Sequence, residues 1–126
     1  MIFGGFMSEE FSRAELLLGA EAMRKLKNSR VAVFGVGGVG GYAVEALARC
    51  GVGALDLIDN DRVSVTNINR QILALHSTVG QNKTDVMADR IRDIAASITD
   101  LSKYMGADSV FFQEFSSSGS CLDVES

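Results

Sequence analysis

The pattern of hydrophobic positions between residues 30 and 59 predicts a strand, a helix and a second strand. Residues 30–34 form a short apolar run that ends in glycines, as expected where a strand turns sharply into a helix. Residues 39–50 are mostly helix formers with small neighbours suited to packing on a sheet. Glycines then end that helix, and residues 54–59 alternate as in a second strand. Together these runs predict a β-α-β unit with parallel strands.

Two short helical pieces are predicted before the first strand. Ser12 and Glu15 have the spacing of a capping box at a helix start, and Gly19 interrupts the helical pattern. The apolar positions of these two pieces are Leu16, Leu17, Met23 and Leu26.

After the second strand comes a polar segment with no sustained period and much turn chemistry, residues 60–81. Loops of this length usually carry function or disorder. A helix is predicted from Asn82 to Ile94, with Asn82 and Asp85 at its start and with Val86, Met87, Ile91 and Ile94 toward the core. Beyond Ile94 the pattern decays. Residues 110–115 could form a strand, and residues 116–120 have the composition of a linker or a frayed terminus.

These elements predict an α/β chain with a Rossmann-like nucleotide-binding fold, in which N-terminal helices are followed by β-α-β-α and the sheet is incomplete. The expected divisions are an N-terminal helical segment at 1–29, an ATP-binding half-domain at 30–94, and a divergent tail at 95–126 that could be partly disordered. An incomplete sheet is expected to leave apolar faces uncovered.

Composition narrows the class of protein. The chain has 126 residues, of which 47% are hydrophobic and 22% charged, as in one soluble globular domain. A formal net charge of −4 argues against a dedicated surface for nucleic acid or anionic membrane. The apolar start MIFGGFM has no cationic flank and is too short for a signal peptide or a spanning helix, so a cytoplasmic location is expected. Cys50 and Cys121 have neither zinc-site nor disulfide-framework spacing.

The glycines of VAVFGVGGVGGY indicate a nucleotide site behind the first strand. Gly35 permits a tight turn, Gly37 and Gly38 let the backbone approach phosphate oxygens, and Gly40 lets the helix lie against the strand. The exposed amides and the positive end of the helix attract an anion. Asp59 lies 19 residues past Gly40, where an acidic residue that binds the ribose hydroxyls is expected.

The polar segment discriminates between nucleotides, because the glycine turn serves a dinucleotide and ATP equally well. Its extra donors and acceptors are Asp61, Asn67, Asn69, Arg70 and Gln71, and Lys83 opens the next helix. A triphosphate needs cations at fixed distances, which the forked Arg70 and the point charge of Lys83 would provide. A hydrated surface loop is the structural alternative. Two other functions stay open: an NAD- or FAD-binding oxidoreductase domain, and a non-catalytic nucleotide-binding or dimerisation module.

Residues 6–94 resemble the start of the ThiF/MoeB/HesA family, the adenylyltransferases related to ubiquitin-activating enzymes. The resemblance rests on SRAELLLG, on VAVFGVGGVGG with EALARCGVG, and on DNDRVSVTNINRQ followed by GQNK. The combination of NINRQILALHSTVG with RAELLLG is most similar to the branch of tRNA threonylcarbamoyladenosine dehydratases.

This resemblance implies that a carboxylate attacks the α-phosphate of ATP, with Mg2+ present, to give an acyl adenylate. In the dehydratase branch the carboxylate belongs to a modified adenosine of tRNA, which we favour over the C-terminus of a ubiquitin-like protein. Matching positions imply that Gly38 with its neighbours and Asp59 hold the nucleotide, and that Asn67, Arg70 and Lys83 contact its phosphates. Arg13 matches an arginine that reaches the ATP of the neighbouring subunit, which implies a homodimer.

The sequence departs from the family after Ile94. Ala95 and Ala96 stand where the family has Asn-Pro, and the chain contains no proline. We find no strand-end aspartate for the metal and do not nominate Asp108, which precedes an apolar run. The chain has about half the length of a family domain, so we expect it to be poorly active alone.

Three further residues are assigned no catalytic role. Cys121 lies in a Ser/Gly tail without a group that would activate a thiol. Cys50 is expected to be a small buried hydrophobe, and His76 to make a polar loop contact.

Overall fold

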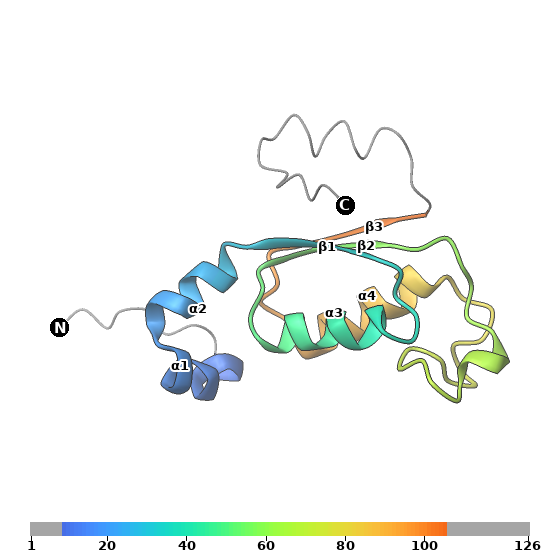
Figure 1. Cartoon of the computed structure of the whole chain (residues 1–126), viewed down its shortest axis with the longest axis horizontal. Helices are drawn as coiled ribbons and strands as arrows, with labels where there is room; N and C mark the ends of the chain where they lie inside the picture. Colours follow the sequence, from blue (N-terminus) through green and yellow to red (C-terminus); the bar gives the residue numbers. More distant parts are fainter. Residues whose placement is uncertain (1–8, 106–126) are drawn as a thin grey trace, which may run out of the picture.

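The computed structural model describes residues 9–105, which form a three-stranded sheet with helices on one face (Figure 1). The elements are a 3-10 helix at Glu9–Phe11, α1 (Ser12–Leu18), α2 (Ala20–Lys27), β1 (Arg30–Phe34), α3 (Gly40–Arg49), β2 (Ala54–Ile58), a 3-10 turn at Val65–Asn67, α4 (Lys83–Ile94) and β3 (Asp100–Tyr104). The α/β class and the β-α-β-α order predicted from the sequence are therefore confirmed.

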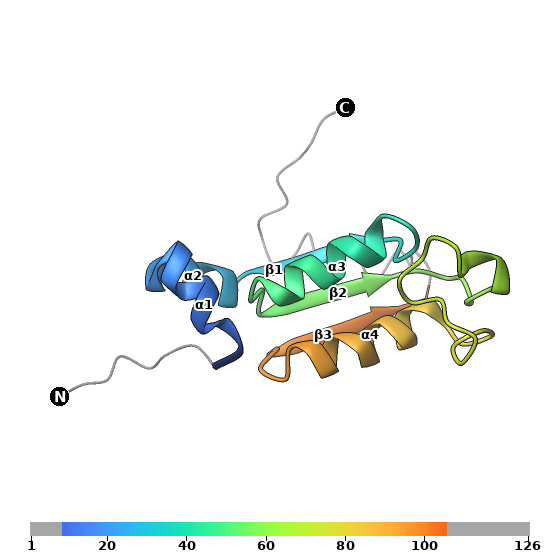
Figure 2. The ribbon, with the colours of Figure 1, turned by 90° about the horizontal axis from the view of Figure 1, so that it is seen from below.

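The sheet is parallel throughout, and its strands lie in the order β1-β2-β3. Arg30 of β1 is in register with Ala54 of β2, which pairs in turn with Asp100 of β3. Because both crossovers step in the same direction across the sheet, α3 and α4 lie side by side on the same face (Figure 2). All three strands consequently end at one edge of the sheet, where α3 begins.

The core lies between the sheet and the two crossover helices. Side chains of a strand alternate between its faces, and the fully buried Leu55 and Leu57 of β2 face the helices. They join a cluster that includes Val44 and Ala48 of α3 and Met87 and Ile91 of α4. The apolar face predicted for α4 is confirmed at Val86, Met87 and Ile91, and Ile94 packs at its border.

The opposite face of the sheet carries a cluster of charges instead of a second core. Arg30 donates to Asp56 through Nη2 at 2.6 Å and to Asp100 through Nη1 at 2.6 Å. Asp56 is fully buried, whereas Asp100 is exposed. Near the other end of this face Phe34 is 56% exposed. None of the labelled helices of residues 9–105 covers this face, as the sequence predicts for an incomplete sheet (Figure 1).

The strand β3 is not predicted from the sequence, which shows no pattern between Ile94 and residue 110. Its sequence DLSKY is mostly polar because β3 lies at the edge of the described sheet. Lys103 faces α4, where its Nζ lies 2.7 Å from Oδ1 of Asp85. The strand expected at 110–115 and the linker at 116–120 lie outside the described residues, as do Asp108 and Cys121.

The N-terminal helices correct one expectation. Gly19 separates α1 from α2 as predicted, but Ser12 and Glu15 form no capping box, since Phe11 is the N-cap residue and no side chain caps the helix. Leu16 and Leu17 are 88% and 85% exposed. Only α2 of these two helices contributes a fully buried residue, Met23, to the core.

Cys50 also differs from expectation. It is exposed at the C-cap of α3 and not buried in the helix. The helical pattern predicts which face of the helix a residue lies on. It does not predict burial at the C-cap, where the chain leaves the helix. Within residues 9–105 no helix is long and apolar enough to cross a membrane.

Candidate nucleotide-binding site

The glycine turn follows β1 at the edge where the strands end. Gly35 has a φ of +86°, a backbone conformation that other residues rarely adopt, and its amide donates to the carbonyl of Ile58 at 2.8 Å. A Cβ on Gly40 would overlap the carbonyl oxygen of Gly35, so only glycine lets α3 start this close to the strand. A Cβ on Gly38 would meet nothing within 4 Å. The turn therefore presents open backbone at the positive end of α3, which suits a phosphate.

Asp59 ties this turn to the polar loop that follows β2. Its Oδ2 accepts a hydrogen bond from the amide of Val36 at 2.9 Å, and its Oδ1 accepts one from the amide of Asp61 at 2.8 Å. Each carboxylate oxygen keeps a second lone pair for a ligand hydroxyl. The carboxylate predicted to bind ribose thus also fixes the backbone of the glycine turn and of the polar loop.

Lys83 joins the same network from the first turn of α4. Its amide donates to the carbonyl of Asp61 at 3.0 Å, and its Nζ lies 3.5 Å from Oδ2 of Asp61. The Lys83 side chain is 7% exposed, whereas that of Asp61 is 67% exposed. A buried ammonium needs close partners, and a single carboxylate at 3.5 Å leaves two of its donors for an anionic ligand.

The remaining predicted residues lie on the loop itself. Nη1 of Arg70 donates to the carbonyl of Thr66 at 3.0 Å and to Oδ1 of Asn69 at 2.9 Å. These contacts hold the exposed guanidinium near the backbone. Asn67 is buried, and its Oδ1 accepts from the amide of Ser64 at 2.8 Å, which leaves its NH2 group as a donor.

The loop between β2 and α4 is folded in part against the core. Val63 donates to Gln81 at 2.8 Å and accepts from Gly80 at 2.8 Å, which closes the loop on itself. Leu73 is 1% exposed. The loop also buries Gln71, one of the predicted donors, beside Gly37. The sequence names this residue but not its contact, because the loop has no period.

Arg13 lies away from the glycine turn. It is exposed on α1, which lies beyond the amino-terminal end of β1, whereas the glycine turn follows the other end of that strand (Figure 1). Within one chain Arg13 therefore does not contribute to this site. His76 is exposed on the loop.

Residues 9–105 contain no group of three or more His, Cys, Asp or Glu side chains that could hold a metal. Mg2+ is usually held by one or two carboxylates together with substrate phosphates. The residues at 9–105 thus offer no all-protein magnesium site, and Asp59 and Asp61 are the carboxylates beside the glycine turn and Lys83.

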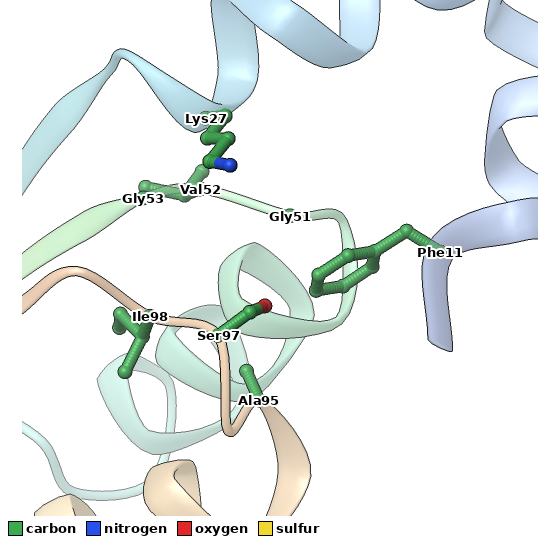
Figure 3. Close-up of a pocket in the computed structure, with 8 residues that line it drawn as sticks. All are labelled: Phe11, Lys27, Gly51, Val52, Gly53, Ala95, Ser97 and Ile98. Atoms are coloured by element: carbon green, nitrogen blue, oxygen red, sulfur yellow. The ribbon is translucent and has the colours of Figure 1, made fainter. Parts of the chain in front are cut away.

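Three cavities of the described residues lie away from the glycine turn, and one of them, of about 410 Å³, is lined by Arg92 and Asp100. A pocket of about 80 Å³ lies at the opposite end of the sheet, where Phe11 faces the turns around Val52 and Ser97 (Figure 3). This volume is well below the several hundred Å³ of typical ligand sites. A groove of about 310 Å³ beside α4 is lined by two carboxylates and one cation, those of Asp89, Asp93 and Arg90.

Comparison with known proteins agrees with the geometry. The model of the ThiF family matches residues 11–109. The tRNA threonylcarbamoyladenosine dehydratase of Bacillus subtilis (strain 168) is 60% identical over 88 residues, which are 70% of this chain and 35% of that protein. The protein of the same name from Escherichia coli (strain K12) is 50% identical over 86 residues, 68% of this chain and 32% of its own length.

The crystal structure of the Escherichia coli dehydratase in complex with ATP has a TM-score of 0.79, at 40% identity over 87% of this chain and 45% of that chain. The chain spans about a third of the length of these two curated relatives. The family match continues past Ile94, where the sequence resemblance was expected to end, and it includes β3.

Proposed function

Because the chain belongs to the ThiF family, we propose that it forms the ATP-binding part of an enzyme that activates a carboxylate as an acyl adenylate. One observation carries this proposal: Asp59 and Asp61 join the open glycine turn to the buried cation Lys83. The turn alone would serve any nucleotide, but a cation held opposite it suits the additional charge of a triphosphate.

Each residue has a role that follows from its position. The backbone of Gly35, Gly37, Gly38 and Gly40 admits the phosphates, and Asp59 accepts from the ribose hydroxyls. Asn67, Arg70 and Lys83 donate to phosphate oxygens. Asp61 orients Lys83, and Asn69 orients Arg70, through the contacts at 3.5 and 2.9 Å.

The reaction joins a carboxylate oxygen to the α-phosphorus of ATP and breaks the bond to pyrophosphate, which leaves. No side chain needs to form a covalent bond with the substrate. The protein therefore acts by aligning the carboxylate with the α-phosphate and by stabilising the negative charge of the transition state. The neutral donors and cations of the site are sufficient for that task. Mg2+ would enter with the phosphates and neutralise part of their charge.

For the carboxylate we favour threonylcarbamoyl-adenosine in a tRNA, in the cytoplasm, over the C-terminus of a ubiquitin-like protein. The two curated relatives named above support this choice. We also propose a homodimer in which Arg13 serves the site of the neighbouring subunit, because α1 lies far from the glycine turn of its own chain. Loss of a comparable arginine in phosphoryl-transfer enzymes costs about 10³ to 10⁵ in rate.

Thermal unfolding tests the nucleotide assignment. ATP with Mg2+ should raise the melting temperature of the chain, whereas NAD at the same concentration should leave it unchanged. Arg70→Ala and Lys83→Ala should each abolish the shift, while Arg92→Ala, which removes an exposed charge on α4, should preserve it. Equal protection by NAD, or full protection of the Arg70 and Lys83 variants, would refute the triphosphate assignment.

A further inference from the structure

The C-terminal half of α2 carries a cluster of cations, although the net charge of the chain is negative. Arg24, Lys25 and Lys27 are exposed, and residues 24–30 contain four cations and no acidic residue. Among the described residues, only Lys25 of these three has an ion pair, with the exposed Glu21 at 3.6 Å. We call Arg24, Lys25 and Lys27 the α2 cations.

Most other cations of the fold are compensated by carboxylates. Ion pairs hold Arg30, Arg49, Lys83, Arg90, Arg92 and Lys103. The cations without a carboxylate partner among residues 9–105 are Arg13, Arg24, Lys27, Arg62 and Arg70. Three of these five lie on the N-terminal helices, and the other two lie on the polar loop. The uncompensated positive charge is therefore local, and the net charge of the whole chain does not describe the surface of α2.

Packing determines which side of α2 faces solvent. Met23 is fully buried and Leu26 packs against the core, so the apolar face of α2 is used within the protein. Arg24 and Lys27 are three residues apart, which makes them neighbours on the helix surface. The exposed side of α2 has positive charge but no large apolar side chain. Such a surface suits the phosphates of a nucleic acid better than a lipid bilayer, which an interfacial helix enters with an apolar face.

We propose that the α2 cations bind the phosphate backbone of the substrate tRNA. This inference rests on the proposed function, in which the carboxylate belongs to a tRNA and Arg13 serves the site of the neighbouring subunit. The helix α2 follows α1 after the single residue Gly19 and packs against it (Figure 1). An α1 that reaches the neighbouring site therefore brings the α2 cations close to that site.

Contacts to phosphates position an RNA without reading its sequence. The α2 cations would hold the body of the tRNA while its modified adenosine enters the nucleotide site. The surface thus adds affinity for the macromolecular substrate and takes no part in binding ATP.

The test measures binding of a fluorescently labelled tRNA transcript to the full chain by anisotropy, between about 50 and 200 mM KCl. The double variant Arg24→Gln/Lys27→Gln removes the two α2 cations that have no ion pair. The matched control is Arg92→Gln/Lys103→Gln, which makes the same change in net charge at two exposed cations on α4 and on β3, the strand at the opposite edge of the sheet from β1.

The α2 double variant should bind tRNA about tenfold more weakly at about 100 mM KCl. The slope of log K against log salt should become shallower by about 1.4 to 1.8, since each neutralised phosphate contributes about 0.7 to 0.9. The control should keep the wild-type affinity and slope. Both double variants should melt near the wild-type temperature, because all four side chains are exposed.

Three results would overturn the proposal. If the cations only complement the dipole at the end of α2, the melting temperature falls and the tRNA affinity does not change. Equal losses of affinity in the two double variants would show a general effect of net charge. If the α2 variant loses binding to vesicles of phosphatidylserine and phosphatidylcholine but keeps wild-type affinity for tRNA, the partner of this surface is a membrane.

Thermal shift with ATP separates this proposal from the proposed function. If tRNA binding depends on the α2 cations but ATP with Mg2+ does not raise the melting temperature, the RNA surface stands and the proposed function fails. If ATP protects the chain and the α2 variant binds tRNA as tightly as wild type, the RNA surface is refuted and the proposed function stands. Absence of tRNA binding by the wild type also refutes the RNA surface.

Discussion

The carboxylate of Asp59 accepts a hydrogen bond from the backbone amide of Val36 at 2.9 Å, and this bond joins the end of β2 to the turn that follows β1. The same carboxylate holds the amide of Asp61 at 2.8 Å. One side chain therefore sets the distance between the glycine turn and the polar loop. Because a ligand would be bound between these two segments, the stability of the turn and the affinity of the site depend on the same residue.

Asp59→Asn should lower both stability and affinity. An asparagine presents one oxygen and one NH2 group, so either Val36 or Asp61 would face a donor in place of an acceptor. Hydrogen bonds to a charged group contribute about 1.5–3 kcal/mol each, and we expect the free energy of unfolding to fall by about 2 kcal/mol. ATP protection should also be lost.

Urea unfolding and thermal shift measure the two effects. Asp89→Asn is the control, because Asp89 is exposed and forms only a surface pair with Arg92 at 3.2 Å. A variant Asp59→Asn as stable as the control would contradict the bridging role.

Two glycines of the turn should respond differently to alanine. Gly38→Ala introduces a Cβ that meets no protein atom within 4 Å, so the melting temperature should remain near that of the wild type while ATP affinity falls. Gly40→Ala places a Cβ on the carbonyl oxygen of Gly35, which forces α3 away from β1 and should destabilise the fold. Circular dichroism melting with and without ATP distinguishes the two. Full ATP protection of Gly38→Ala would show that the phosphates bind elsewhere.

The ion-pair cluster on the open face of the sheet should depend mainly on Arg30. Asp56 is fully buried and its carboxylate is held by Arg30, whose pKa is raised by its hydrogen bonds to Asp56 and then to Asp100. Arg30→Ala leaves Asp56 buried without a counter-ion, and such losses cost about 3–5 kcal/mol. Since the Arg30 side chain is 44% exposed, we expect the lower end of that range. Asp100→Ala should cost below about 1 kcal/mol. Urea unfolding that ranks the two variants in the reverse order would refute this assignment.

Acid should weaken the contact between α3 and α4. Oε2 of Glu45 lies 3.0 Å from Nε of Arg90, and Oε1 lies 2.8 Å from Nη2 of Arg49. The hydrogen bond from Arg90 is the largest cause that holds the pKa of Glu45 below its ordinary value of 4.5, against the opposing effect of burial. A carboxylate with a lowered folded-state pKa stabilises the protein above its unfolded pKa, and this stability is lost as the pH falls through the folded value.

The melting temperature should therefore fall as the pH is lowered below about 4.5, and Glu45→Gln should reduce the size of that fall. Glu21→Gln, which changes an exposed pair with Lys25 at 3.6 Å, should behave like wild type. Identical pH profiles for Glu45→Gln and wild type would exclude this contribution.

The sequence predicts those parts of the fold that depend on backbone requirements. Gly35 and Gly40 are recognisable because no other residue satisfies their φ angle or close approach, and Asp59 because it ends a strand at a fixed spacing from them. The strand β3 is not recognisable from the sequence. Lys103 faces α4 and pairs with Asp85, so a charged residue stands where the pattern of a strand would have an apolar one. Leu16 and Leu17 are apolar helix positions that stay exposed, which the sequence pattern alone does not reveal because apolar residues need not be buried.

The contact of Gln71 with Gly37 cannot be predicted from the spacing of apolar residues. It arises from the closure of the loop by Val63 and Gln81, a contact between residues distant in sequence. The roles of the individual site residues stay predictions, although the structure brings Asp59, Asp61 and Lys83 into one network.

The central claim is that the glycine turn and the polar loop together hold a triphosphate. Titration of the 15N-labelled chain with ATP and Mg2+, with AMP and with NAD, followed by amide chemical shifts, tests it most directly. We predict that ATP shifts the amides of Gly37 and Gly38 together with those of Arg70 and Lys83, and that AMP shifts the glycines while moving Arg70 and Lys83 much less. The claim is contradicted if ATP leaves Arg70 and Lys83 unshifted, or if NAD produces the same pattern as ATP.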